Sequence, residues 1–263
     1  MSETLNLRNL EWALTTLTEL ILFVYLVRRK LFRSHPIFSA YILGAILQSV
    51  LMAATYGIWG TQSYRAWLTY WLSQLVMETA RFAAVAEVVR RVLSPFAGIW
   101  ALGRRVLIAA AGSVFVYAAL LSREYYRKYP LNLDRGVGLA VAAVIVTLLL
   151  FARYYGLPMN HLDRSLCIGF CLYSCFAVIN DSILEKWATG FMNLWSFLGV
   201  LTFLASLLLW LGAARAYSET APAGVPVIVP KELYGRLSSE LNVRLRLLNE
   251  HLNQLLNSGN PRS

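Results

Sequence analysis

Residues 74–82 read Q-L-V-M-E-T-A-R-F, which places an acid and an arginine, Glu78 and Arg81, inside an apolar run from residue 66 to residue 89. Across the 263 residues of the chain, 58% are hydrophobic and only 14% are charged, and the mean hydropathy is +0.54. This composition lies far outside the usual balance of a soluble domain. The sequence therefore predicts an integral membrane protein, in which Glu78 and Arg81 need a specific environment.

Windows of about 20 residues, which match a hydrocarbon core about 30 Å thick, predict seven transmembrane helices. The predicted spans cover residues 10–29, 37–58, 66–89, 104–122, 136–153, 165–185 and 191–214. None of them alternates as a membrane β-strand does, and in lipid only helices and closed barrels satisfy their own backbone. The predicted fold class is therefore all-α, an integral membrane bundle of seven transmembrane helices within residues 1–216.

Basic residues beside the spans favour an N-terminus outside and a C-terminus inside the cell. The inner side would carry Arg28, Arg29, Lys30, Arg33, Arg90, Arg91, Arg104, Arg105, Arg153 and Arg164, against Arg8, Arg65, Arg123, Arg127, Lys128, Arg135 and Lys186 outside. The net charge of +10 then indicates orientation and attraction to the anionic headgroups of the lipid bilayer, and not nucleic-acid binding. The expected location is the plasma membrane, or the inner membrane of a bacterium, as a multi-pass protein.

The end of the chain has a different pattern. Residues 217–230 form a proline-rich linker, residues 231–257 repeat leucine every three or four positions, and residues 258–263 form a tail expected to be disordered. The leucine stripe predicts a cytoplasmic amphipathic helix. Three arrangements would cover the stripe: a short coiled coil in a homo-oligomer, contact with lipid headgroups, or docking on the bundle or a partner protein.

The polar positions of the third predicted span share one helical face. Trp67, Trp71, Gln74, Glu78 and Arg81 are spaced by 4, 3, 4 and 3 residues, so they stack along the helix. An ionisable residue at the bilayer centre costs about 2.5–3.5 kcal/mol or more. This face is therefore expected to turn into the bundle, where Glu78 and Arg81 either form a structural ion pair or belong to a binding site.

Other spans offer polar partners at compatible depths. Glu19 lies in the first, Gln48 in the second and Asp181 in the sixth. Glu19, Glu78 and Asp181 together outnumber Arg81, so the surplus carboxylates are expected to carry a proton or to hold a cation. The candidate ligand- or ion-binding residues are Glu19, Gln48, Gln74, Glu78, Arg81 and Asp181. The tryptophans above them are typical of an interface belt, with the roof of an organic-cation site as the alternative.

Three cysteines recur every four residues in the sixth span, at Cys167, Cys171 and Cys175. Sulfurs on successive turns are too far apart to hold one metal ion, and their geometry disfavours a disulfide. The pattern instead predicts close helix packing, and Gly138 in the fifth span predicts the same.

Several functional classes are disfavoured by residue types. The spans contain no lysine for a retinal Schiff base, and the three histidines lie outside them, so neither retinal nor haem is expected. No cofactor or metal is predicted. The sequence also lacks H-E-x-x-H, G-x-S-x-G and Walker motifs, so an enzyme is not expected.

Two functions remain. The first is a receptor-like or accessory membrane protein, with an outward-facing polar cavity in the bundle and a tail helix that binds a partner or a second copy. The alternative is a small transporter, channel or proton-coupled carrier that uses Glu19, Glu78 and Arg81.

Overall fold

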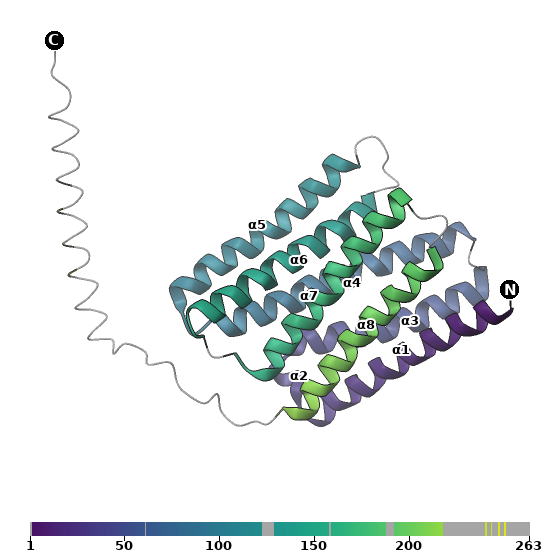
Figure 1. The fold of residues 1–263 in the computed structure, drawn as a ribbon, viewed down its shortest axis with the longest axis horizontal. Coiled ribbons are helices and arrows are strands. Elements are labelled where there is room, and N and C mark those ends of the chain that lie inside the picture. Colours follow the sequence, from purple (N-terminus) through teal and green to yellow (C-terminus); the bar gives the residue numbers. More distant parts are fainter. Residues whose placement is uncertain are drawn as a thin grey trace, which may run out of the picture. The chain divides into compact units, whose positions relative to one another are not determined.

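The computed structural model of the chain is helical throughout the residues that it describes (Figure 1). These are residues 2–60, 62–122, 129–157, 159–187 and 192–217, and four positions near the C-terminus: Glu240, Val243, Leu247 and Glu250. Side chains are described from residue 11 onward within these ranges, except at 97, 129–131, 181–187 and 192–196. The chain divides into two compact units, residues 1–219 and 220–263. The predicted linker, tail helix and disordered end lie outside the described residues, apart from Tyr217 and those four positions.

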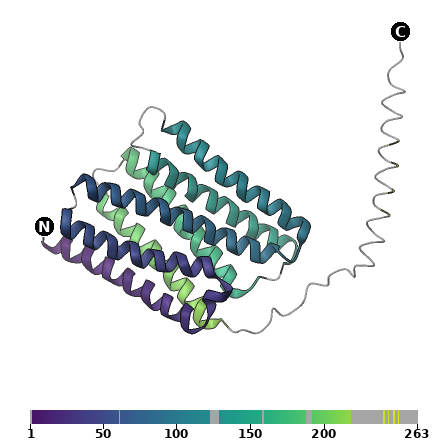
Figure 2. The ribbon, with the colours of Figure 1, turned by 180° about the vertical axis from the view of Figure 1, so that it is seen from behind.

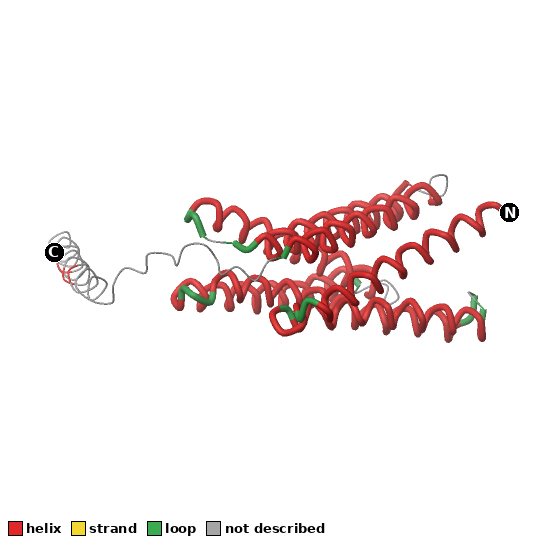
Figure 3. The backbone as a smooth tube through the Cα atoms, turned by 90° about the horizontal axis from the view of Figure 1, so that it is seen from below, coloured by secondary structure: helices red, strands yellow, loops and turns green. Residues whose placement is uncertain are grey.

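In the described part of the first unit, the helices follow one another with short connections, and Figure 3 shows the loops only at helix ends. Their bounds are α1 (Ser2–Arg28), α2 (Leu31–Ser34), α3 (Pro36–Trp59), α4 (Tyr64–Leu93), α5 (Ala97–Leu121), α6 (Tyr129–Tyr154), α7 (His161–Trp187) and α8 (Met192–Ala216). Local chemistry explains several starts. Pro36 occupies the first turn of α3, and the Ser63 hydroxyl accepts a hydrogen bond from the Ala66 amide at the start of α4.

Five of these helices are long and apolar enough to cross a membrane. The segments that qualify are Pro36–Trp59, Gly98–Leu121, Asn132–Tyr154, His161–Asn180 and Phe197–Ala216, in α3, α5, α6, α7 and α8. The α4 helix differs because it buries Glu78, Arg81 and Glu87 among its apolar residues. The seven predicted spans thus reduce to five apolar ones, and spanning by α1 and α4, like the orientation of the bundle, stays a prediction.

The helices of the first unit lie in two groups. Figure 2 shows α1, α3 and α4 side by side, and each packs on the next along this series. The α6, α7 and α8 helices form a second series of neighbours, and α1 also contacts α8. The α4 helix contacts α3, α5, α6 and α7, which makes it the helix with the most neighbours in the described part of the chain.

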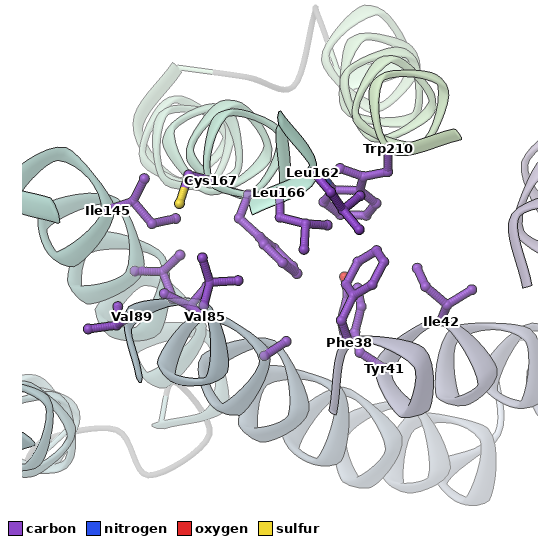
Figure 4. Close-up of a cluster of buried hydrophobic side chains, with 14 of the residues drawn as sticks. Phe38, Tyr41, Ile42, Val85, Val89, Ile145, Leu162, Leu166, Cys167 and Trp210 are labelled. Carbon is purple, nitrogen blue, oxygen red and sulfur yellow. The ribbon is translucent and has the colours of Figure 1, made fainter. Parts of the chain in front are cut away.

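Aromatic side chains fill the centre between α3, α7 and α8 (Figure 4). The Trp210 ring of α8 lies 5.3 Å from the Phe38 ring and 4.7 Å from the Phe170 ring, measured between centroids. The Phe38 and Trp210 rings meet edge to face, which aromatic pairs favour. Exposed leucines and valines cover the outer faces of the helices, as expected of surfaces that meet lipid.

The closest helix contacts occur at glycines. A Cβ atom at Gly169 of α7 would lie 2.7 Å from Cε2 of Trp210, and the Gly169 carbonyl accepts a hydrogen bond from the Ser206 hydroxyl at 3.0 Å. Gly138 of α6 likewise allows the close approach of α7 that its sequence context predicted. The cysteines do not share one packed face, since Cys167 is buried, Cys171 half-buried and Cys175 exposed.

Replacing Gly169 by alanine should destabilise the α7–α8 contact. The added methyl group would overlap the Trp210 indole, and overpacking of this kind costs about 1–2 kcal/mol. The measurement is SDS-induced unfolding of the detergent-solubilised protein. The matched control is Gly212→Ala in α8, where a Cβ atom would meet nothing within 4 Å. Equal stability of the two variants would contradict the packing described here.

A polar cluster joins three helices at the end of the bundle where α3 begins. We call His35, Arg91 and Asp163 the junction cluster. His35 Nε2 lies 2.8 Å from Asp163 Oδ1 and Arg91 Nε lies 3.5 Å from the same oxygen, while Arg91 also donates to the Ser34 carbonyl. An ionised carboxylate only accepts, so the bonded ring nitrogen of His35 must carry the proton. The cluster ties the α2–α3 connection to α4 and α7.

Candidate functional site

A chain of amide and carboxylate groups runs along the inner face of α4. Gln48 of α3 donates to Gln74 Oε1 at 3.3 Å, and the Gln74 amide donates to Glu78 Oε1 at 3.1 Å. The four-residue step from Gln74 to Glu78 places them one turn apart, which is why this bond forms within the helix. The side-chain amides therefore connect α3 to the charged centre of α4.

Arg81 is the centre of this polar group. Its side chain is only 1% exposed, and it pairs with Glu78 three residues earlier. Its Nη2 atom also lies 3.5 Å from Asp134 Oδ1 of α6, and its guanidinium carbon lies 5.1 Å from the centre of the Tyr173 ring of α7. The positive charge of the buried arginine is compensated by the negative charge of the carboxylates and by the quadrupole of the aromatic ring.

Gly138 provides the space that this arrangement needs. A Cβ atom there would lie 2.7 Å from Val178 Cγ2 and 4.0 Å from Arg81 Nη2. The glycine thus lets α6 and α7 close around the guanidinium. Small residues at such contacts are typical of helices packed in membranes.

The two acids compete for one base. Arg81 pairs with Glu78 of its own helix, and its Nη2 atom lies 3.5 Å from Oδ1 of Asp134 in α6. The two carboxyl groups therefore lie beside the same guanidinium.

A pocket of about 200 Å³ opens beside these acids, between α4 and α6. Its lining combines polar groups with aromatic and aliphatic side chains: Trp67, Leu68, Trp71, Leu72, Gln74, Leu75, Glu78, Leu133 and Asp134. The Trp67 and Trp71 rings stand edge to face, 6.4 Å apart. The helical stripe identified in the sequence thus contributes Trp67, Trp71, Gln74 and Glu78 to one wall of this pocket, whereas Arg81 does not line it.

The structure brings together four of the six candidate residues: Gln48, Gln74, Glu78 and Arg81. Glu19 of α1 is buried, but its Oε2 has no hydrogen-bond partner among the described side chains. No hydrogen bond or ion pair among the described residues joins Glu19 to this group. Asp181 belongs to α7, and its side chain lies outside the described residues.

Sequence reasoning missed Asp134. The fifth span was expected to begin at 136, which assigned Asp134 to a loop, whereas α6 begins at Tyr129 and carries it on the second turn. The sequence does show a carboxylate two residues before the expected span. It was not assigned to the span because averaging hydropathy over a window favours a start at the first uninterrupted apolar stretch.

Comparison with models of protein families, with curated proteins and with solved structures gave no match to this chain. The pocket and the charged groups beside it are therefore the features that indicate a function.

Proposed function

We propose that the chain is a receptor-like or accessory protein of the plasma membrane that binds a small molecule in the pocket between α4 and α6. The observation that supports this proposal is the pocket of about 200 Å³ bordered by Glu78, Asp134 and two tryptophans. Apolar walls with a few convergent polar groups are typical of small-molecule sites. An ion pair that only stabilises the fold would not require a pocket beside it.

The position of α4 supports a signalling role. Glu78 and Arg91 are thirteen residues apart, a separation of about 20 Å along the helix from the pocket to the junction cluster. A ligand that moves α4 at the pocket would therefore change the contacts of Arg91 with Asp163 and with the α2–α3 connection. In this proposal the change passes to the tail helix, which associates with a partner protein or a second copy.

The proposal is tested by water access to the pocket. Leu75 lines the pocket and Val76 does not, although both side chains are exposed at the surface of the protein. Single cysteines at each position, in a background with Cys167, Cys171 and Cys175 replaced by alanine, would be treated with a membrane-impermeant maleimide in proteoliposomes. We expect Leu75→Cys to react several times faster than Val76→Cys, because Val76 is expected to face lipid. Equal protection of both would refute an aqueous pocket.

The buried Glu78–Arg81–Asp134 group supports the carrier alternative. A carrier would move its ligand or protons across a sealed proteoliposome, and Glu78→Gln would abolish that flux. The receptor-like role predicts ligand binding without flux. It also predicts that truncation at Tyr217 leaves binding intact and removes association through the tail.

A further inference from the structure

We infer that the ligand of this pocket is an organic cation, an ammonium group with apolar substituents. This inference depends on the proposed function, because it assigns a ligand class to the same pocket. It follows from a lining that combines two tryptophans, two carboxyl groups without a basic side chain, and otherwise mostly aliphatic residues.

The tryptophans provide the first argument. Trp67 and Trp71 lie on successive turns of α4 and both border the pocket, with their ring centres 6.4 Å apart. Tryptophan is the aromatic side chain that attracts cations most strongly, and sites for quaternary ammonium groups are commonly built from such rings. The leucines between and beside them suit methyl or methylene substituents.

The carboxyl groups provide the second argument. Glu78 and Asp134 border the pocket, and the described residues that line it include no basic side chain. Arg81 pairs with both acids from outside this lining. Other charged or titratable side chains near the group are Tyr41 of α3, Arg135 of α6 and Tyr173 of α7. A bound cation would therefore meet two carboxyl groups without displacing a basic side chain.

The lining disfavours two other ligand classes. Calcium takes six to eight oxygen ligands, and this pocket offers oxygens from Gln74, Glu78 and Asp134 only. An anion would meet both carboxyl groups before reaching Arg81, whose guanidinium is 1% exposed and already paired. An apolar cation matches both the charge and the surface.

The test uses the purified full chain in maltoside micelles, a detergent without an ammonium headgroup. Isothermal titration with choline and with benzyltrimethylammonium, up to about 10 mM, should give dissociation constants of about 1 mM or lower for at least one of them. The uncharged isostere of choline, 3,3-dimethylbutan-1-ol, should bind at least about tenfold more weakly.

Variants connect the binding to this pocket. Trp71→Leu and Asp134→Asn should each weaken cation binding by about tenfold, because they remove a ring and a charge. Trp12→Leu and Glu11→Gln, on α1 and away from the pocket, should change it less than about twofold. Trp71→Leu keeps the ion pairs intact, so it remains informative if Asp134→Asn folds poorly.

The ammonium group could reach the pocket as a soluble molecule or as a lipid headgroup. Short-chain phosphatidylcholine and phosphatidylglycerol, added as competitors, distinguish the sources. Displacement of the bound cation by phosphatidylcholine alone indicates a headgroup site, and no displacement by either lipid indicates a soluble ligand.

The outcomes separate this inference from the proposed function. If Leu75→Cys reacts with the maleimide but neither cation binds, or the isostere binds equally well, the pocket stands and its assignment to a cation is wrong. If Leu75→Cys is protected, the pocket itself is refuted. Cation binding that is unchanged in Trp71→Leu would also overturn the inference.

Discussion

Replacing Arg81 by methionine is expected to lower the free energy of unfolding by about 3–5 kcal/mol. The guanidinium is the shared partner of Glu78 and Asp134, and its removal leaves these two largely buried acids without that partner. The loss should be measured by SDS-induced unfolding in mixed micelles. It should shrink as the pH is lowered, because protonation of both carboxyl groups removes the uncompensated charge.

Two further variants control this result. Glu78→Gln combined with Arg81→Met removes one acid with the base, and should recover at least half of the lost stability, since one carboxyl group can then stay neutral. Thr79→Val changes an exposed residue of the same helix and should have little effect. A stable Arg81→Met protein at neutral pH would show that the carboxyl groups are solvated, and would remove the charge argument for the pocket.

Replacing Asp163 by alanine should destabilise the opposite end of the bundle by about 2–3 kcal/mol. His35 is fully buried, so its ring N–H would lose its partner without gaining water, and Arg91 would lose the same oxygen. The same unfolding assay measures the effect.

Asp163→Asn keeps an oxygen acceptor for His35 and should cost less than half as much as Asp163→Ala. Arg91→Gln should also be mild, because Arg91 is about one-third exposed and can be replaced there by water. If Asp163→Asn and Asp163→Ala were equally unstable, the charge of Asp163 and not its acceptor oxygen would hold the junction cluster together.

The helical stripe on α4 was predictable because it depends on one helix alone. The free-energy cost of placing charges in lipid and the spacing of three or four residues can both be read from the sequence of that helix. Glu78 and Arg81 must avoid lipid, and their three-residue separation fixes that they meet. Gln48 was identified from its depth alone, and its bond to Gln74 follows from the antiparallel packing of α3 on α4.

Contacts between distant helices were not predictable. His35 and Asp163 are 128 residues apart, and the sequence placed both of them beside turns without indicating that they meet. Asp134 joined the group because α6 begins at Tyr129, seven residues before the predicted span. Glu19 was expected at the depth of the polar group, but α1 packs mainly on α3 and α8, and helix order cannot be derived from hydropathy.

The α4 helix is not among the helices apolar enough to cross a membrane, because the buried charges of Glu78, Arg81 and Glu87 lower its hydropathy, and its spanning stays a prediction. The mean hydropathy of a sequence window describes how an isolated helix would partition into lipid. Polar side chains that face other helices are instead surrounded by protein groups, which hydropathy does not take into account.

The side chain of Glu87 has a consequence for how the protein is made. Its two carboxylate oxygens accept hydrogen bonds from the Ile37 and Phe38 amides, at 3.2 and 2.9 Å, in the first turn of α3. The ribosome produces α3 some fifty residues before Glu87, as the sequence separations of 50 and 49 show. These two amides therefore gain their carboxylate partner only after Glu87 has been synthesised, and we expect the first turn of α3 to reach its final hydrogen bonding together with α4.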